Sequence, residues 1–249
     1  MPQVLTTPEG RTIAYHQTPG QGPGVVFLGG FRSDMGGTKA LWLEEWCRKQ
    51  GRAFLRFDYS GHGASSGDFE DGCIGDWTAD ALAALSLTAG PQVLVGSSMG
   101  GWIALLLARA VPDRVAGLVG IAAAPDFTER LWNGLTEAER DALRDTGRLV
   151  RASQYSAQGD VYTRRLIEDG EDRLILTRRL TLPFPVRLLQ GEADADVPPG
   201  VALSLFAHAT GPDIRLTLVK GADHRFSTPE CLGLIGQSVD DVLKRADHA

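Results

Sequence analysis

The stretch that decides the fold is Gly96-Ser97-Ser98-Met99-Gly100-Gly101, which has the pattern G-x-S-x-G with Ser98 at its centre. The apolar run 92–95 before it predicts a buried strand, and the run 102–111 after it predicts a helix. In this strand–turn–helix context, the serine lies on a sharp turn that exposes its hydroxyl above a sheet. Glycine is needed at 96 and 100 because side chains there would collide with neighbouring backbone. We therefore predict that Ser98 is a nucleophile.

Strand-like and helix-like apolar patterns alternate on both sides of this motif. The pattern predicts strands at 4–6, 11–16, 25–28, 53–57, 92–95, 115–121, 186–190 and 215–219. Helices are predicted at 38–50, 77–88, 102–111 and 201–208, with a last one starting at Thr228-Pro229-Glu230. This alternation is typical of an α/β fold, in which a mostly parallel sheet is covered by helices on both faces. The first two strands flank Thr7-Pro8-Glu9-Gly10, which predicts an opening hairpin and therefore a mixed sheet.

Residues 126–182 interrupt this rhythm, because they show no convincing buried strand. Thr136 and Glu139 have the spacing of a helix capping box. Phe127, Leu131, Trp132 and Leu135 fall near one face of a helix. We expect one domain over 1–249, with 126–182 as a helical cap over one end of the sheet.

A serine nucleophile needs a base, and the base needs a carboxylate that orients it. On this architecture the chain order is Ser, then acid, then His. His16 and His62 precede Ser98, His208 lies within a predicted helix and His248 stands at the end of the chain. His224 is the remaining histidine, and it lies in a turn directly after the strand 215–219. We predict His224 as the base.

The acid is expected in the turn after the strand 186–190. Asp194 and Asp196 both lie in this turn, and Asp126 after the strand 115–121 is a third candidate. Asp194 is favoured because it stands three residues after Gly191, at the tip of the turn. Asp196 would then be a solvated charge or a partner of the turn backbone.

The negatively charged oxygen of a tetrahedral intermediate needs two oriented N–H donors. One donor is expected from Met99, the residue after the nucleophile. The other should come from the turn after the strand 25–28, which is Gly29-Gly30-Phe31. We predict the Phe31 amide as this second donor, with the Phe31 ring on the wall of the pocket.

Composition excludes several classes of protein. The chain has 249 residues and a formal charge of −6, so it lacks the clustered positive charge that nucleic-acid binding requires. No stretch of eighteen apolar residues predicts a membrane span. The N-terminus has no signal-peptide pattern. Cys47, Cys73 and Cys231 are odd in number and far apart without a motif spacing, which fits neither a disulfide framework nor a zinc site. We expect a cytoplasmic enzyme without metal or organic cofactor, as a monomer or a homodimer.

Together these residues resemble the α/β-hydrolase superfamily. The stretch 58–65, Asp-Tyr-Ser-Gly-His-Gly-Ala-Ser, is similar to the D-x-R-G-H-G-x-S turn of that superfamily, with Ser60 in place of its arginine. The spacing of Gly191, Asp194 and Val197-Pro198 is also similar to that of the superfamily. The resemblance implies an eight-stranded, mostly parallel sheet, and it implies a structural rather than chemical role for His62.

A closer resemblance, to mitochondrial palmitoyl-protein thioesterases that also cleave acyl glucuronides, runs with gaps from about Val25 onward. It rests on the stretches 37–40, 56–61, 90–102, 185–191 and 238–243. It implies a serine esterase or thioesterase with Ser98, Asp194 and His224 as its triad. We expect the chain to differ from this relative in having no targeting segment, and it differs in Gly29-Gly30-Phe31 at the oxyanion turn.

The sequence thus predicts hydrolysis of acyl esters or thioesters through an acyl-enzyme. Carbon–carbon bond hydrolysis and peracid formation on the same fold are alternatives, because a serine triad is compatible with both. A third alternative is a non-catalytic binding protein on the same fold.

Substrate contacts are predicted for three residues. Arg32, beside the oxyanion turn, is a candidate partner for a substrate carboxylate, because guanidinium binds carboxylates through two hydrogen bonds. Residues 126–182 contain 10 Arg and no Lys, and one of these arginines could serve the same purpose. Leu131 and Trp132, with Leu135, are candidates for seating a fatty acyl chain. The alternative is that they pack the cap onto the sheet.

Overall fold

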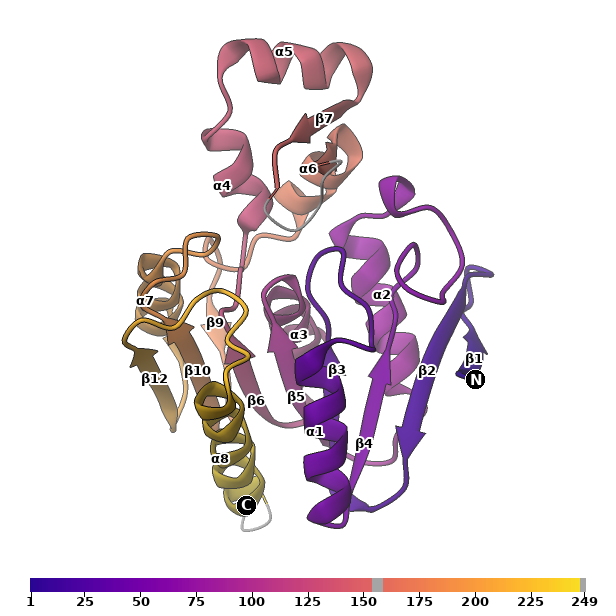
Figure 1. Ribbon diagram of the computed structural model, residues 1–249, viewed down its shortest axis with the longest axis vertical. Helices are drawn as coiled ribbons and strands as arrows, with labels where there is room; N and C mark the ends of the chain where they lie inside the picture. Colours follow the sequence, from indigo (N-terminus) through magenta and orange to yellow (C-terminus); the bar gives the residue numbers. More distant parts are fainter. Residues whose placement is uncertain (154–158, 247–249) are drawn as a thin grey trace.

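A twisted sheet of eight strands runs through the molecule, and helices cover both of its faces (Figure 1). The computed structural model describes residues 1–153 and 159–246. The strand order is β1-β2-β4-β3-β5-β6-β10-β12. The strands are β1 (Gln3–Thr6), β2 (Thr12–Thr18), β3 (Gln21–Leu28), β4 (Arg52–Phe57), β5 (Gln92–Ser97), β6 (Val115–Ile121), β10 (Val186–Gly191) and β12 (Ile214–Val219). Only the pairs β1–β2 and β2–β4 in this sheet are antiparallel, so the predicted mixed α/β sheet is confirmed.

The central strands are buried on both faces, as their continuous apolar runs predict. In β3, Val25 and Phe27 point to one face, where they pack with α1 (Thr38–Lys49) and α8 (Pro229–Ala246). Val26 and Leu28 point to the other, toward helices α2 (Ile74–Leu85), α3 (Met99–Ala110) and α7 (Pro199–His208). This alternation follows from the two-residue period of a strand. Two apolar layers therefore fix the sheet between its helices.

The carboxyl ends of the parallel strands meet at one edge of the sheet, and the cap lies above that edge (Figure 1). We use the name cap for residues 126–182. It contains α4 (Phe127–Asn133), α5 (Glu137–Thr146), β7 (Arg148–Arg151), β8 (Asp160–Thr163), α6 (Arg164–Asp172) and β9 (Leu180–Thr181). Short helical turns η1 (Phe69–Asp71) and η2 (Pro112–Arg114), and strand β11 (Ala209–Thr210), complete the described elements.

The cap is not the wholly helical segment that we expected, because it also contains the strands β7, β8 and β9. Strands β7 and β8 form an antiparallel hairpin within it. Both are only partly buried, so they lack the apolar run that marks the strands of the main sheet. The predicted capping box of Thr136 and Glu139 does begin α5.

Candidate active site

Ser98 lies on the turn between β5 and α3, with φ 55° and ψ −119°. A non-glycine residue rarely adopts this conformation, and such strain is typical of functional sites. Backbone hydrogen bonds hold it in place, since the Ser98 amide donates to Ile121 and the Ser98 carbonyl accepts from Gly101 and Ala124, at 2.9–3.0 Å. A Cβ added at Gly100 would overlap the carbonyl oxygen of Leu28. The turn therefore forms only with glycine at this position.

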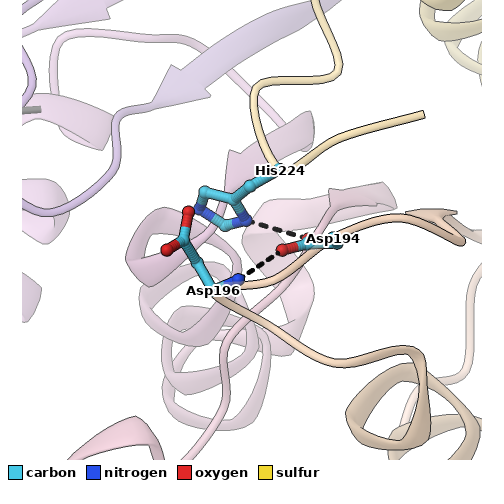
Figure 2. A group of neighbouring side chains, drawn as sticks. All are labelled: Asp194, Asp196 and His224. Carbon is cyan, nitrogen blue, oxygen red and sulfur yellow. Dashed lines mark hydrogen bonds and ion pairs between the residues drawn. The ribbon is translucent and has the colours of Figure 1, made fainter. Parts of the chain in front are cut away.

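His224 bridges Ser98 and a buried carboxylate. Its Nε2 lies 3.1 Å from Ser98 Oγ. Its Nδ1 lies 2.9 Å from Asp194 Oδ2, a contact that Figure 2 draws as a dashed line. The Asp194 carboxylate is fully buried, whereas the His224 ring is 17% exposed. In the tautomer that satisfies both contacts, Nδ1–H donates to Asp194 and Nε2 accepts from the serine hydroxyl. Three residues that the sequence placed in separate turns thus form one chain of hydrogen bonds.

Asp194 is held by donors from its own turn and from the end of β10. The amides of Asp196 and Val197 donate to Oδ1 at 3.0 and 2.8 Å, and Gln190 Nε2 donates to Oδ2 at 2.9 Å. Burial alone would raise the pKa of Asp194, but the hydrogen bonds from His224, Val197 and Gln190 outweigh it and leave this pKa below its usual value. The carboxylate therefore stays charged and fixed beside the imidazole.

The two alternative acids do not accept from His224 Nδ1, which lies against Asp194. Figure 2 shows the Asp196 carboxylate beside the imidazole ring and Asp194 in line with Nδ1. Asp126 begins α4, where its carboxylate accepts the amides of Ile175 and Leu176 at 2.8 Å. That arrangement ties the two ends of the cap together. The structure therefore brings Asp194 to His224 and gives Asp126 a different set of contacts. His248 lies outside the described residues.

Donor atoms of Asp194, Asp196 and His224 lie within 4.8 Å of one another, which makes them a group that could hold a metal ion. Both imidazole nitrogens already have hydrogen-bond partners, and so does each Asp194 oxygen. This arrangement can move a proton from Ser98 toward His224 without any further group.

The predicted oxyanion donors flank Ser98. Met99 is the first residue of α3, so its amide has no acceptor within the helix. Phe31 follows β3, which neighbours β5 in the sheet. The Gly30 carbonyl accepts from Ser33 N at 3.2 Å and from Ser33 Oγ at 2.8 Å. Because a trans peptide is planar, the N–H of Phe31 points away from these donors.

A cavity of about 570 Å³ opens beside Ser98, with the oxyanion turn and the start of α1 on one side and the cap on the other. Phe31 and Arg32 are among the residues that line it. The Phe31 ring stacks on Tyr162 of the cap, with centroids 5.5 Å apart. Arg32 lies over the ring of Phe69 at 4.6 Å. Core and cap therefore meet across this cavity.

Leu131 and Trp132 do not line the cavity, so their prediction as pocket residues is wrong. They pack with Leu135, Leu143 and Ile167 in a small core of the cap itself. Helical periodicity identified an apolar face, but it could not show that this face turns toward α5 and α6.

The cap instead lines the cavity with residues that the sequence analysis did not assign to it, namely Phe127, Arg130, Asp160 and Tyr162. Phe127 and Arg130 belong to the first turns of α4, just after a parallel strand. That position was the available signal, because loops at this edge of the sheet surround the site. For Tyr162, in the short strand β8, no signal of comparable strength exists.

A family model described as "Alpha/beta hydrolase family" matches residues 25–249. The chain belongs to the α/β-hydrolase family. It is 36% identical over 244 residues to bovine "Palmitoyl-protein thioesterase ABHD10, mitochondrial", covering 97% of this chain and 79% of that protein. The human protein of the same name is 35% identical with the same coverage. The family and its relatives make the chain a hydrolase.

Solved structures agree. Mouse alpha/beta hydrolase domain-containing protein 10 superposes with a TM-score of 0.92 at 34% identity, covering 98% of each chain. A crystal structure of a protein from Agrobacterium vitis S4 gives 0.94 at 40% identity, again with 98% of each chain. The curated relatives are named as mitochondrial, and the cytoplasmic location expected above stays a prediction for this chain. Among the described residues, no helix is long and apolar enough to span a membrane.

Proposed function

We propose that this chain hydrolyses acyl esters or acyl thioesters through a covalent acyl-enzyme on Ser98. The observation that carries the proposal is the position of His224, 3.1 Å from the serine hydroxyl and 2.9 Å from the buried Asp194 carboxylate. A serine hydroxyl is a weak nucleophile until an adjacent base accepts its proton. The names of the thioesterase relatives support the same class of reaction.

In the first half-reaction, Ser98 Oγ attacks the acyl carbonyl as His224 Nε2 takes the hydroxyl proton. Asp194 holds the imidazole by its Nδ1 and stabilises the imidazolium that forms. The tetrahedral intermediate collapses when the alcohol or thiol leaves with the proton from Nε2. Water then attacks the acyl-enzyme by the same route and releases the carboxylic acid.

The amides of Phe31 and Met99 hold the oxyanion in both half-reactions. Loss of one such donor typically slows catalysis by about 10²–10³-fold. The positive end of the α3 dipole, next to Ser98, acts in the same direction.

The cavity supports a substrate with an apolar acyl part and a polar remainder. Phe31, Phe127, Tyr162 and Val197 supply apolar wall, while Arg32 and Arg130 supply guanidinium groups. Arg130 donates to the Pro125 carbonyl at 2.6 Å. Palmitoyl-type thioesters and acyl glucuronides both combine these features, so we propose them as the substrate types to test, with Arg32 facing a substrate carboxylate.

The test is hydrolysis by purified wild-type protein and by Ser98→Ala, with Ser204→Ala on the exposed side of α7 as a control. A panel of p-nitrophenyl esters, acyl thioesters and acyl glucuronides serves as substrate. We expect Ser98→Ala to fold normally and to lose at least about 10³-fold in kcat, as triad removal does elsewhere. A fluorophosphonate probe should label Ser98 in the wild type.

Turnover by Ser98→Ala near the wild-type rate would refute the proposal. Wild-type protein that accepts the probe at Ser98 but hydrolyses no ester or thioester in the panel would favour the alternative chemistries, cleavage of carbon–carbon bonds or peracid formation. Folded protein that the probe does not label would favour a binding protein.

A further inference from the structure

The turn that carries the Phe31 amide has a strained centre. Gly30 and Ser33 close a four-residue turn through the Gly30 carbonyl and the Ser33 amide. Arg32, the third residue, has φ 56°. A turn with positive φ at this position alone is of type II, and glycine is the usual residue there. An arginine needs outside support to hold this conformation.

That support comes from His62. The Arg32 amide donates to His62 Nε2 at 3.3 Å, and His62 Nδ1 lies 3.1 Å from the carbonyl oxygen of Ser60. A carbonyl only accepts, so Nδ1 carries the proton and Nε2 carries the lone pair. The ring is thus a neutral imidazole that receives the central N–H of the turn. Turns of types I and II differ in the orientation of the central peptide, here the one between Phe31 and Arg32. The hydrogen bond from the Arg32 amide to His62 therefore favours type II.

The ring itself has little freedom to move. His62 is 4% exposed and lies edge-on to Phe69 and Trp77, with ring centroids 5.0 and 5.2 Å away. The same two rings contact Phe31, at 4.8 and 6.1 Å. Burial lowers the pKa of His62, which favours the neutral ring that this geometry requires.

We propose that His62 is a positioning residue for the oxyanion hole. It holds the Arg32 peptide so that the neighbouring Phe31 amide points at the substrate oxygen. The inference rests on the proposed function, since it assigns the Phe31 amide to the oxyanion. It gives the histidine of the stretch 58–65 a part in the reaction, beyond the structural role that the family resemblance implied.

Substitution of His62 by glutamine or by asparagine distinguishes the roles of the two ring contacts, Nε2 with the Arg32 amide and Nδ1 with the Ser60 carbonyl. The terminal amide of glutamine reaches about as far as Nε2, so His62→Gln can offer an acceptor to the Arg32 amide. Asparagine reaches about as far as Nδ1, so His62→Asn keeps a donor for Ser60 and leaves Arg32 without a partner. His62→Phe keeps an aromatic ring among Phe69 and Trp77 but has no acceptor.

The experiment measures kcat, KM and the melting temperature of these three variants with a neutral p-nitrophenyl ester. We expect kcat of the Gln variant to stay within about threefold of wild type, and the Asn and Phe variants to lose about 10- to 10²-fold, below the loss of a whole oxyanion donor. KM should change little. Binding of an acyl trifluoromethyl ketone, whose adduct carries the oxyanion, should weaken in parallel with kcat because such adducts resemble the transition state.

Equal kcat in the Gln, Asn and Phe variants would overturn the inference, and so would a kcat that follows melting temperature and not the presence of an acceptor. The Phe variant tests this even if the Asn variant unfolds. Failure of the proposed function looks different, because Ser98→Ala would then remain active. If Ser98→Ala is inactive while all His62 variants match the wild type, the triad stands and only the role of His62 fails.

Discussion

The sheet core and the cap are built on different physical principles. In the core, strands buried on both faces lie between two large apolar layers. The cap has a small apolar cluster around Leu135, Leu143 and Ile167, and most of its arginines lie at exposed positions. Several of them form ion pairs, such as Arg148–Glu70 and Arg165–Asp76 across the boundary to the core.

This difference separates two tasks. The core holds Ser98, Asp194 and His224 after the carboxyl ends of strands, through backbone and side-chain hydrogen bonds. The cap forms the opposite wall of the cavity through Phe127, Tyr162 and their neighbours. We infer that changes in the core alter the chemistry or the fold, whereas changes in the cap alter which substrates fit.

The largest effect is expected from Gly100→Ala in the core. The new methyl group would overlap the carbonyl oxygens of Leu28 and Gly29, which are backbone atoms and cannot move alone. We expect no soluble folded protein, or a loss of more than about 4 kcal/mol in the free energy of unfolding, a size reserved for such clashes. Circular dichroism and urea unfolding measure this. Gly200→Ala, where an added Cβ meets no atom within 4 Å, is the matched control.

The next largest effect is expected from Asp194→Asn, compared with Asp196→Asn two residues away. The first change leaves the imidazole without the carboxylate that orients it, and in other triads this lowers kcat by about 10⁴-fold. Asp196 does not accept from Nδ1, so Asp196→Asn should keep kcat within about tenfold of wild type. We allow a loss of this size because the Asp196 charge lies beside the imidazole ring. Steady-state kinetics on one ester compares them. A larger loss of kcat for Asp196→Asn than for Asp194→Asn would show that Asp196, and not Asp194, is the acid of the triad.

The sequence predicted the core well because its constraints are local. Parallel strands covered on both faces need continuous apolar runs, so β3, β5 and β6 were recognisable. The nucleophile turn needs glycine at 96 and 100. The chain order of the triad then left one suitable histidine, His224. Spacing alone left Asp194 and Asp196 both open, because the choice depends on which side chain turns inward.

The cap was harder to predict because its contacts depend on tertiary structure and not on local sequence constraints. Periodicity marked Leu131 and Trp132 as one apolar face, but the partner of that face is α5 and α6, which only the tertiary structure shows. The hairpin of β7 and β8 is short and half-exposed, so it carries no apolar run. Tyr162 therefore had no signal, although it forms the contact with Phe31.

A smaller effect is expected within the cap from Leu143→Ala. Leu143 is 1% exposed in the cap cluster, and such truncations cost about 2–5 kcal/mol where the site cannot collapse. We expect the lower end of this range because the cluster is small. Hydrolysis of a short ester should persist while KM for a long acyl chain rises. Leu203→Ala, at a half-exposed position of α7, is the control and should change neither.

The charge of Lys39, a core residue that lines the cavity beside Ser98, should make folded stability depend on pH. Lys39 donates to the Arg225 carbonyl at 2.5 Å, next to His224, and burial lowers its pKa from 10.5 to about 8. Between pH 8 and 10.5 the unfolded chain then binds more protons here than the folded one, so folded stability rises with pH. Relative to Lys39→Met, wild-type stability should increase over this window. A parallel pH dependence of the two proteins would contradict the lowered pKa.

The smallest effect is expected from the ion pair Arg148–Glu70, which joins the cap to the core at 2.8 Å with both side chains about half-exposed. Exposed pairs of this kind contribute about 0.2–1 kcal/mol, and salt weakens them further. A double-mutant cycle with Arg148→Ala and Glu70→Ala, measured by urea unfolding at low and high salt, gives the coupling energy. If it exceeds about 1 kcal/mol and survives salt, then charge holds the cap in place, and the apolar contact of Phe31 with Tyr162 is not what joins the two regions.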